Sequence, residues 1–267
     1  MMRETVAVVG LGNIGGAIAA RCVRVGHRVI GVEADVRRAR AWSEMTGALV
    51  VARTADVMRE LPDRVLVVVR TGEQALQVAR EVTESAGPEL ALHLMTTLDP
   101  VTAGAIAEAV GAAVRVLEQP VSGGAAAAVE GTLTVLSAGP SRPVDEAFLL
   151  GAVAARVFHF ERYGQPALVK LMNNAVAAAN LRVTARMLGQ AGDLGVDPVQ
   201  LQAVLATSSG ASYMGRMVAG LADDQASLLV KDVALLAGHG AALEPIDIGD
   251  TDGLLADLDR ARRLLAD

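Results

Sequence analysis

Short apolar runs rich in β-branched residues alternate with helical, Ala- and Arg-bearing segments from Thr5 to about His159. This alternation is typical of βαβ units around a parallel sheet. Runs such as Val65–Val69 are apolar throughout, as expected for strands that helices cover on both faces. The first half therefore predicts an α/β, doubly wound sheet. Its expected strands are Thr5–Val9, Arg28–Glu33, Ala48–Val51, Val65–Val69, Leu90–Met95, Val114–Leu117, Leu133–Ser137 and Val157–Phe160.

The pattern changes after Phe160, where no further β-rich run occurs. The segment from Gly164 to Gly192 carries charges only at Lys170, Arg182 and Arg186. Its Gly-Gln-Pro start and its closing glycine predict one helix, roughly 40 Å long at ~1.5 Å per residue. A helix that is apolar on nearly all sides must be enclosed. We therefore expect two domains, 1–162 and an all-α 163–267, the second completed by another subunit in a homodimer or homotetramer.

Composition excludes several classes of protein. With 52% hydrophobic and 20% charged residues, the chain is globular rather than disordered. A formal charge of −6 and few aromatic residues argue against a nucleic-acid partner. The longest uncharged stretch, Pro198 to Gly215, contains Gln, Thr, Ser and Gly, so we expect no membrane span and a cytoplasmic location. The single Cys22 and four scattered histidines indicate no metal site.

A glycine motif directly follows the first predicted strand and opens a helix. Gly10 permits the tight turn, Gly12 lets backbone approach a pyrophosphate, and Gly15 lets helix and strand pack closely. This context predicts a Rossmann-type dinucleotide-binding domain, with the anion at the helix N-terminus. The predicted cofactor contacts here are Gly10, Leu11, Gly12, Asn13, Ile14 and Gly15.

Glu33 closes the second predicted strand, near the offset at which an acidic residue binds the adenosine ribose. Because a carboxylate repels a 2′-phosphate, Glu33 favours NAD over NADP. Arg37, Arg38 and Arg40 follow, and they either pair with such a phosphate or form the solvated face of the next helix.

Two further segments carry candidate chemistry. Around Ser122, Gly123 and Gly124, successive amides with little side-chain bulk can converge on a substrate carboxylate, although an ordinary glycine loop has the same composition. Lys170 and Asn174, four positions apart on the long helix, share a face. A lysine in a water-poor site has its pKa moved toward the range of general acid–base catalysis, whereas a lysine snorkelling to water does not.

These motifs, in this order, resemble the β-hydroxyacid dehydrogenase family, which includes 3-hydroxyisobutyrate dehydrogenase and tartronate semialdehyde reductase. The resemblance rests on Gly10–Gly15 with Gly26-His27, Pro120–Gly124, Gly164–Asn174, the Lys231-Asp232 motif, and a Thr96-Thr97-Leu-Asp-Pro turn.

The resemblance implies hydride transfer between a nicotinamide cofactor and a short 3-hydroxycarboxylate or its semialdehyde or oxo partner. It implies that Lys170 exchanges the proton and that Ser122, Gly123, Gly124 and Asn174 hold the substrate. Val69, Arg70, Thr96, Thr97 and Lys231 are expected near the cofactor.

The chain also departs from the family pattern. Glu118-Gln119 stands where the family usually has Asp-Ala before Pro-Val-Ser-Gly-Gly, and Leu94 stands where it has an aspartate at a strand end. Arg70 stands where the family commonly has proline, and Arg186 where many members carry glutamate. Each of the two arginines either recognises an additional anionic group or makes a structural ion pair.

Two alternatives to a dehydrogenase remain at this point. Imine reduction on the same scaffold is disfavoured because relatives with that activity tend to replace the lysine. A non-catalytic dinucleotide sensor is disfavoured by the retention of Lys170, Asn174 and Ser122. Asn173 argues against phosphogluconate as substrate, since those enzymes carry histidine there.

Overall fold

The computed structural model describes residues 3–87, 89–239 and 250–266. The chain divides into two compact units, Met1–Lys170 and Leu171–Asp267. The division falls inside helix α8 (Gln165–Asp193), whereas the sequence places the domain boundary just before that helix, at 162/163.

The first unit is built on a six-stranded parallel sheet in the order β3-β2-β1-β4-β5-β6. This order and the helices between the strands confirm the predicted doubly wound, Rossmann-type fold. The strands are β1 (Thr5–Val9), β2 (Arg28–Val32), β3 (Leu49–Val51), β4 (Arg64–Val67), β5 (Ala91–Leu94) and β6 (Arg115–Glu118).

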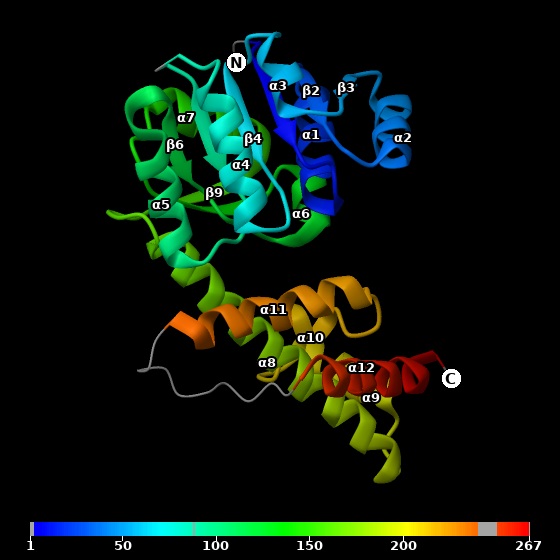
Figure 1. Ribbon diagram of the computed structural model, residues 1–267. Coiled ribbons are helices and arrows are strands. Elements are labelled where there is room, and N and C mark those ends of the chain that lie inside the picture. Colours follow the sequence, from blue (N-terminus) through cyan, green and yellow to red (C-terminus); the bar gives the residue numbers. More distant parts are fainter. Residues whose placement is uncertain (1–2, 88, 240–249, 267) are drawn as a thin grey trace. The chain divides into compact units, whose positions relative to one another are not determined.

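Helices cover both faces of this sheet (Figure 1). Alternate residues of β1 point to opposite sides: Ala7 and Val9 join one core with α3, α4 and α5, while Val6 and Val8 join another with α1, α2 and α6. The helices are α1 (Asn13–Arg24), α2 (Val36–Thr46), α3 (Thr54–Met58), α4 (Gly72–Thr83), α5 (Pro100–Val110), α6 (Gly124–Glu130) and α7 (Pro143–Phe148).

Several helix starts follow directly from the sequence. Asp35 caps α2 by accepting from the Arg38 amide, and Thr71 forms a capping box with Gln74 at α4. Asp99 caps α5, whose first residue is Pro100.

A second, three-stranded sheet follows the first. Its strands are β7 (Val121–Ser122), β8 (Leu133–Ser137) and β9 (Ala154–His159), with β7 antiparallel and β9 parallel to β8. The predicted strands Leu133–Ser137 and Val157–Phe160 lie here, and the sequence did not predict the two-residue β7. Short η1 (Gly111–Ala113) and η2 (Leu149–Val153) complete the unit.

The described part of the second unit is helical, as predicted. It contains the rest of α8, α9 (Pro198–Thr207), α10 (Tyr213–Arg216), α11 (Asp223–His239) and α12 (Thr251–Ala266). Leu181, Ala185 and Leu188 of α8 pack with Leu254 and Leu258 of α12 in the core. On another face of α8, Val176 and Val183 are each 59% exposed among the residues that the structure describes.

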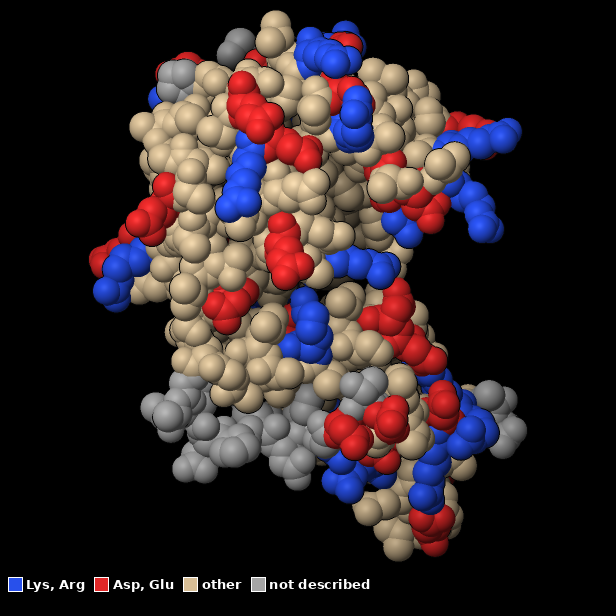
Figure 2. Space-filling view, in the orientation of Figure 1, with Lys and Arg blue, Asp and Glu red and all other residues tan. Residues whose placement is uncertain are grey.

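Basic and acidic side chains are interspersed on the face shown in Figure 2. Exposed side chains of opposite charge also form ion pairs, such as Arg40–Glu44 and Arg260–Asp193. Within the described ranges, no helix is long and apolar enough to cross a membrane, and no cluster of three or more His, Cys, Asp or Glu side chains could hold a metal ion.

Candidate active site

The carboxyl ends of five parallel strands meet at one edge of the large sheet. The register aligns Val32, Val9, Val67, Leu94 and Glu118 in one row across β2, β1, β4, β5 and β6. The strand order reverses between β1 and β4, and ligands of open α/β sheets bind at such a point. The predicted segments that follow β1, β2, β4 and β5 therefore share this edge.

The glycines of the loop after β1 have distinct roles. A Cβ on Gly10, whose φ is +92°, would lie 2.4 Å from the Val68 carbonyl oxygen. A Cβ on Gly15 would lie 2.0 Å from the Gly10 carbonyl oxygen, so Gly15 is needed for helix and loop to pack. A Cβ on Gly12 would meet nothing within 4 Å, so this glycine is not required for internal packing.

The start of α1 fits an anionic group. Gly12 occupies the N-cap position, so no side chain caps this helix, and its first turn contains no acidic residue. The first amides of a helix have no partner within the helix. Those of Asn13, Ile14 and Gly15 can therefore donate to a pyrophosphate, favoured by the helix dipole.

Glu33 lies beside this loop. Its Oε2 accepts hydrogen bonds from the Leu11 amide at 3.1 Å and from Arg38 Nη1 at 3.0 Å, and its Oε1 accepts from the Asp35 amide at 2.9 Å. Burial raises the pKa of Glu33, but these hydrogen bonds outweigh burial and lower the pKa overall. The group is therefore a carboxylate at neutral pH, and it holds Arg38. Arg40 pairs with Glu44 instead.

The residues after β4 and β5 brace one another. The Thr96 hydroxyl accepts from the Val69 amide at 3.0 Å and lies 3.1 Å from the Val69 carbonyl oxygen, to which it can donate. Thr96 is thus buried and engaged by backbone, while Thr97 is half-buried. The Arg70 amide donates to Gln74, and its side chain is exposed.

The predicted substrate loop joins β7 to α6. Ser122 ends β7 and is half-buried. Gly123 has a φ of +131°, and a Cβ there would lie 2.7 Å from the Ala127 Cβ. Gly123 caps α6 without a side chain, and Gly124, with a φ of +74°, begins the helix. The backbone around Ser122–Gly124 is therefore presented without side-chain bulk.

Glu118 and Gln119, which precede this loop, have roles that the sequence did not predict. The Glu118 carboxylate is 1% exposed and accepts from the amides of Gly164 at 2.6 Å and Ala167 at 2.9 Å, at the start of α8. Burial raises its pKa, against the effect of these two hydrogen bonds. Tyr163 donates to the Val116 carbonyl at 2.8 Å, so β6 holds the entry to α8 through two residues.

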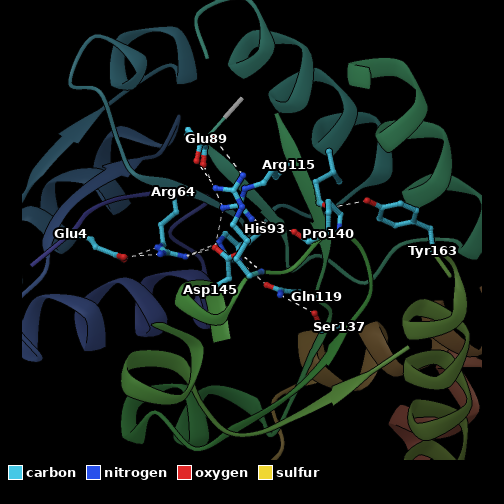
Figure 3. A network of polar contacts seen from close by, with 12 residues as sticks. Glu4, Arg64, Glu89, His93, Arg115, Gln119, Ser137, Pro140, Asp145 and Tyr163 are labelled. Atoms are coloured by element: carbon cyan, nitrogen blue, oxygen red, sulfur yellow. Dashed lines mark hydrogen bonds and ion pairs between the residues drawn. The ribbon is translucent and has the colours of Figure 1, made fainter. Parts of the chain in front are cut away.

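Gln119 belongs to a buried polar network around His93 (Figure 3). It contacts His93 Nδ1 at 2.6 Å and donates to the Ser137 hydroxyl at 3.0 Å. On the other side of the ring, His93 Nε2 lies 3.2 Å from Arg64. Burial, together with the charge of Arg64, lowers the pKa of His93 to about 3, so the ring is neutral and accepts from the guanidinium.

Lys170 and Asn174 are separated by one turn of α8, as predicted, and each side chain is 8% exposed. Within the helical unit, Asn174 Nδ2 donates to Asp232 Oδ2 at 2.6 Å. Asp232 Oδ1 lies 3.2 Å from Lys231 Nζ, so Asp232 connects two predicted site residues. Asp232 was not predicted as a site residue. Its position next to Lys231 in an otherwise apolar segment was the feature of the sequence that could have indicated this role.

Arg186, which replaces a glutamate of the family pattern, lies on α8 with its Nε 3.6 Å from Asp257 Oδ2 of α12. Arg182 approaches the same carboxylate, with its Nε at 3.8 Å. This geometry matches the structural ion-pair alternative for Arg186.

Comparisons with known proteins agree with this architecture. Residues 5–160 match the family described as the NAD binding domain of 6-phosphogluconate dehydrogenase. An L-threonate dehydrogenase of Escherichia coli O6:H1 is 29% identical over 260 residues, which cover 92% of this chain and 86% of that protein. A 3-hydroxyisobutyrate dehydrogenase of Pseudomonas aeruginosa is 29% identical over 217 residues, covering 78% and 71%.

Among solved structures, a 3-hydroxyisobutyrate dehydrogenase from Salmonella typhimurium superposes with a TM-score of 0.80 over 99% of this chain and 100% of that one. At 21% identity, this likeness shows a shared fold. The family match spans more than half of the chain and includes the glycine loop, Glu33 and the Ser122–Gly124 segment. Residues 5–160 therefore form an NAD-binding domain of the type found in 6-phosphogluconate dehydrogenase. The chain belongs to the β-hydroxyacid dehydrogenase family and is an NAD(P)-dependent oxidoreductase.

Proposed function

We propose that this enzyme transfers a hydride between NAD and a short 3-hydroxycarboxylate, or its semialdehyde or oxo partner, with Lys170 as general acid and base. The observation that carries the proposal is the burial of Lys170 on the second turn of a helix whose start is fixed to the end of β6. A nicotinamide supplies or accepts the hydride. In reduction, Lys170 donates a proton to the carbonyl oxygen as negative charge develops there.

The roles of the surrounding residues follow from their contacts. The backbone around Ser122, Gly123 and Gly124 would bind the substrate carboxylate, and Asn174, oriented by Asp232, would bind the substrate beside Lys170. In oxidation, Lys170 takes up the hydroxyl proton and must be neutral beforehand. Turnover in that direction should therefore rise with pH.

The proposed preference for NAD rests on Glu33. Its carboxylate is charged, lies next to the glycine loop, and occupies the guanidinium of Arg38 that a 2′-phosphate would otherwise attract. The dinucleotide-binding residues we propose are the glycine loop Gly10–Gly15, Glu33, Val69, Arg70, Thr96, Thr97 and Lys231.

We also propose that the enzyme is a homodimer or larger homo-oligomer formed through α8. Apolar side chains recur on the exposed face of this helix at spacings of four, seven and four residues: Met172, Val176, Val183 and Met187. Val176 and Val183 are each 59% exposed. Such a stripe pairs with its own copy about a two-fold axis, burying both.

The test of the catalytic proposal is a panel of short 3-hydroxy acids, including 3-hydroxyisobutyrate, together with L-threonate, assayed with NAD and NADP for wild type and Lys170→Ala. The variant should bind NAD as wild type does and lose turnover by about three orders of magnitude, because only proton transfer is removed. Turnover retained in the variant would overturn the role of Lys170. A panel without any turnover by wild type would overturn the substrate class.

A further inference from the structure

Glu118 makes contacts that an ordinary strand-end residue does not make. Its side chain is 1% exposed, and both carboxylate oxygens are used: Oε2 accepts from the Gly164 amide and Oε1 from the Ala167 amide. Both amides belong to the entry and first turn of α8. This helix carries no capping side chain of its own from Gly164, so a residue 46 positions away supplies the acceptor.

This contact orients the first turn of α8, which lies in the same unit as Glu118. Ala167 and Lys170 are three positions apart and share a helix face. An acceptor held against the Ala167 amide therefore sets the direction in which Lys170 projects. Tyr163 and Gly164 restrain the same turn, since Tyr163 donates to Val116 and a Cβ on Gly164 would lie 2.5 Å from the Pro100 carbonyl oxygen.

Glu118 is equally tied to the substrate loop. It is the last residue of β6, Gln119 is anchored by His93 and Ser137, and Pro120 then leads into Val121–Ser122. Backbone hydrogen bonds in both directions join Glu118 to Ala138 beside β8. One rigid residue thus holds the backbone before the loop and the first turn of the helix.

We infer that Glu118 is a positioning residue that sets Lys170 relative to the Ser122–Gly124 loop. This inference rests on the proposed role of Lys170. The negative charge of Glu118 at the helix N-terminus also stabilises the first turn through the helix dipole. A displacement of a catalytic group by about 1 Å can cost about 100-fold in rate, so loosening this turn should lower kcat.

The experiment compares Glu118→Gln with wild type in the full-length enzyme. A glutamine amide has one acceptor oxygen, so it can satisfy only one of the two backbone amides. We expect kcat to fall about 10- to 100-fold, the Kd for NAD to stay within about twofold, and amide hydrogen exchange of the peptide around Gly164–Ala167 to accelerate. Glu118→Asp, which keeps both oxygens and the charge, should recover part of the lost kcat.

Asp145→Asn is the matched control. Asp145 is also a fully buried carboxylate at a helix start, accepting from the Arg142 amide at 2.8 Å, but its partners are Arg64 and Arg115 rather than α8. Its replacement should lower stability and leave kcat per folded molecule unchanged.

Three outcomes would overturn the inference: an unchanged kcat in Glu118→Gln, an equal loss of kcat in Asp145→Asn, or a loss of NAD binding that matches the loss of kcat. If Glu118→Gln does not fold, Glu118→Asp decides: a lowered kcat with unchanged NAD affinity supports positioning, and wild-type kcat opposes it. An active Lys170→Ala variant would instead show that the proposed function itself has failed.

Discussion

Asn174 of α8 donates a 2.6 Å hydrogen bond to Asp232 of α11, and the other carboxylate oxygen of Asp232 faces Lys231. Because the Asn174 amide nitrogen is committed to Asp232, the orientation of the whole amide is fixed. Asp232, which was not predicted as a site residue, thus determines how a predicted substrate contact is presented.

Replacing Asp232 with Asn should weaken substrate binding. The Asn174 amide loses its charged acceptor, and the hydrogen bond to a charged group is worth about 1.5–3 kcal/mol. We expect KM for the hydroxy acid to rise about tenfold or more, measured by steady-state kinetics. Asp223→Asn, an exposed carboxylate on the same helix that pairs with Arg262, should leave KM unchanged. A KM equal to that of wild type in Asp232→Asn would contradict the assignment.

Two substitutions in the glycine loop should separate protein stability from NAD binding. Gly15→Ala places a Cβ 2.0 Å from a backbone oxygen and should destabilise the fold by about 3 kcal/mol, visible as a lower Tm. Gly12→Ala meets no atom within 4 Å, so its Tm should be that of wild type. Its Kd for NAD, measured by fluorescence titration, should nevertheless rise at least about tenfold because the Cβ obstructs the pyrophosphate. Unchanged NAD affinity in Gly12→Ala would place the cofactor elsewhere.

Cofactor choice should respond to Glu33. Glu33→Gln removes the charge that repels a 2′-phosphate and frees the Arg38 guanidinium to attract it. The ratio of kcat/KM with NADP to that with NAD should rise about tenfold. Adding Arg38→Ala should cancel part of the gain. If the ratio is the same in wild type and Glu33→Gln, other residues choose the cofactor.

Because of His93, the free energy of unfolding of the first unit should fall as the pH is lowered. Its folded pKa, lowered by burial from 6.5 to about 3, means that the unfolded chain binds a proton between these pH values and the folded chain does not. Above pH 6.5 the His93 ring is neutral in both the folded and the unfolded chain, so it causes no loss of stability. Between pH 6.5 and about 3, the free energy of unfolding falls by about 1.4 kcal/mol for each unit that the pH is lowered. Urea unfolding at pH 7, 6 and 5 should show that His93→Asn, which cannot take up this proton, loses less stability than wild type. Parallel pH dependences would exclude this effect.

The exposed face of α8 should control assembly. Val176→Glu or Val183→Glu places a charge among the exposed apolar side chains of α8. Either variant should convert the oligomer to a monomer, as measured by light scattering. Val204→Glu changes an exposed valine of α9 and should not alter the mass. A wild-type enzyme that is monomeric at all concentrations would refute the proposed interface.

Much of this fold could be predicted because the signals are local. The runs Thr5–Val9 and Leu133–Ser137 match β1 and β8 at both ends, and the long helix begins and ends within one residue of its expected limits. The glycine loop was predicted with its context, since the conformation of Gly10 and the packing of Gly15 are properties of the strand, turn and helix themselves.

The missed features depend on contacts between distant residues. A two-residue strand such as β7 has no periodicity, and it exists because β8 pairs with it. The partners of Glu118 are backbone amides 46 and 49 positions away, which a side-chain pattern does not reveal. Likewise, the bond between Asn174 and Asp232 spans 58 positions and forms only once α8 and α11 pack.

The uninterrupted course of α8 through Lys170 and Asn174 makes their mutual orientation sensitive to chain length. Each residue of an α-helix advances the chain by about 100°. A one-residue insertion after Leu171 would therefore rotate Asn174 by about 100° around the helix axis relative to Lys170. Both residues would still be present, but they would no longer share a helix face. Insertions and deletions in this segment are consequently more damaging than most point substitutions, and chimaeras between relatives must be joined here without any gain or loss of length.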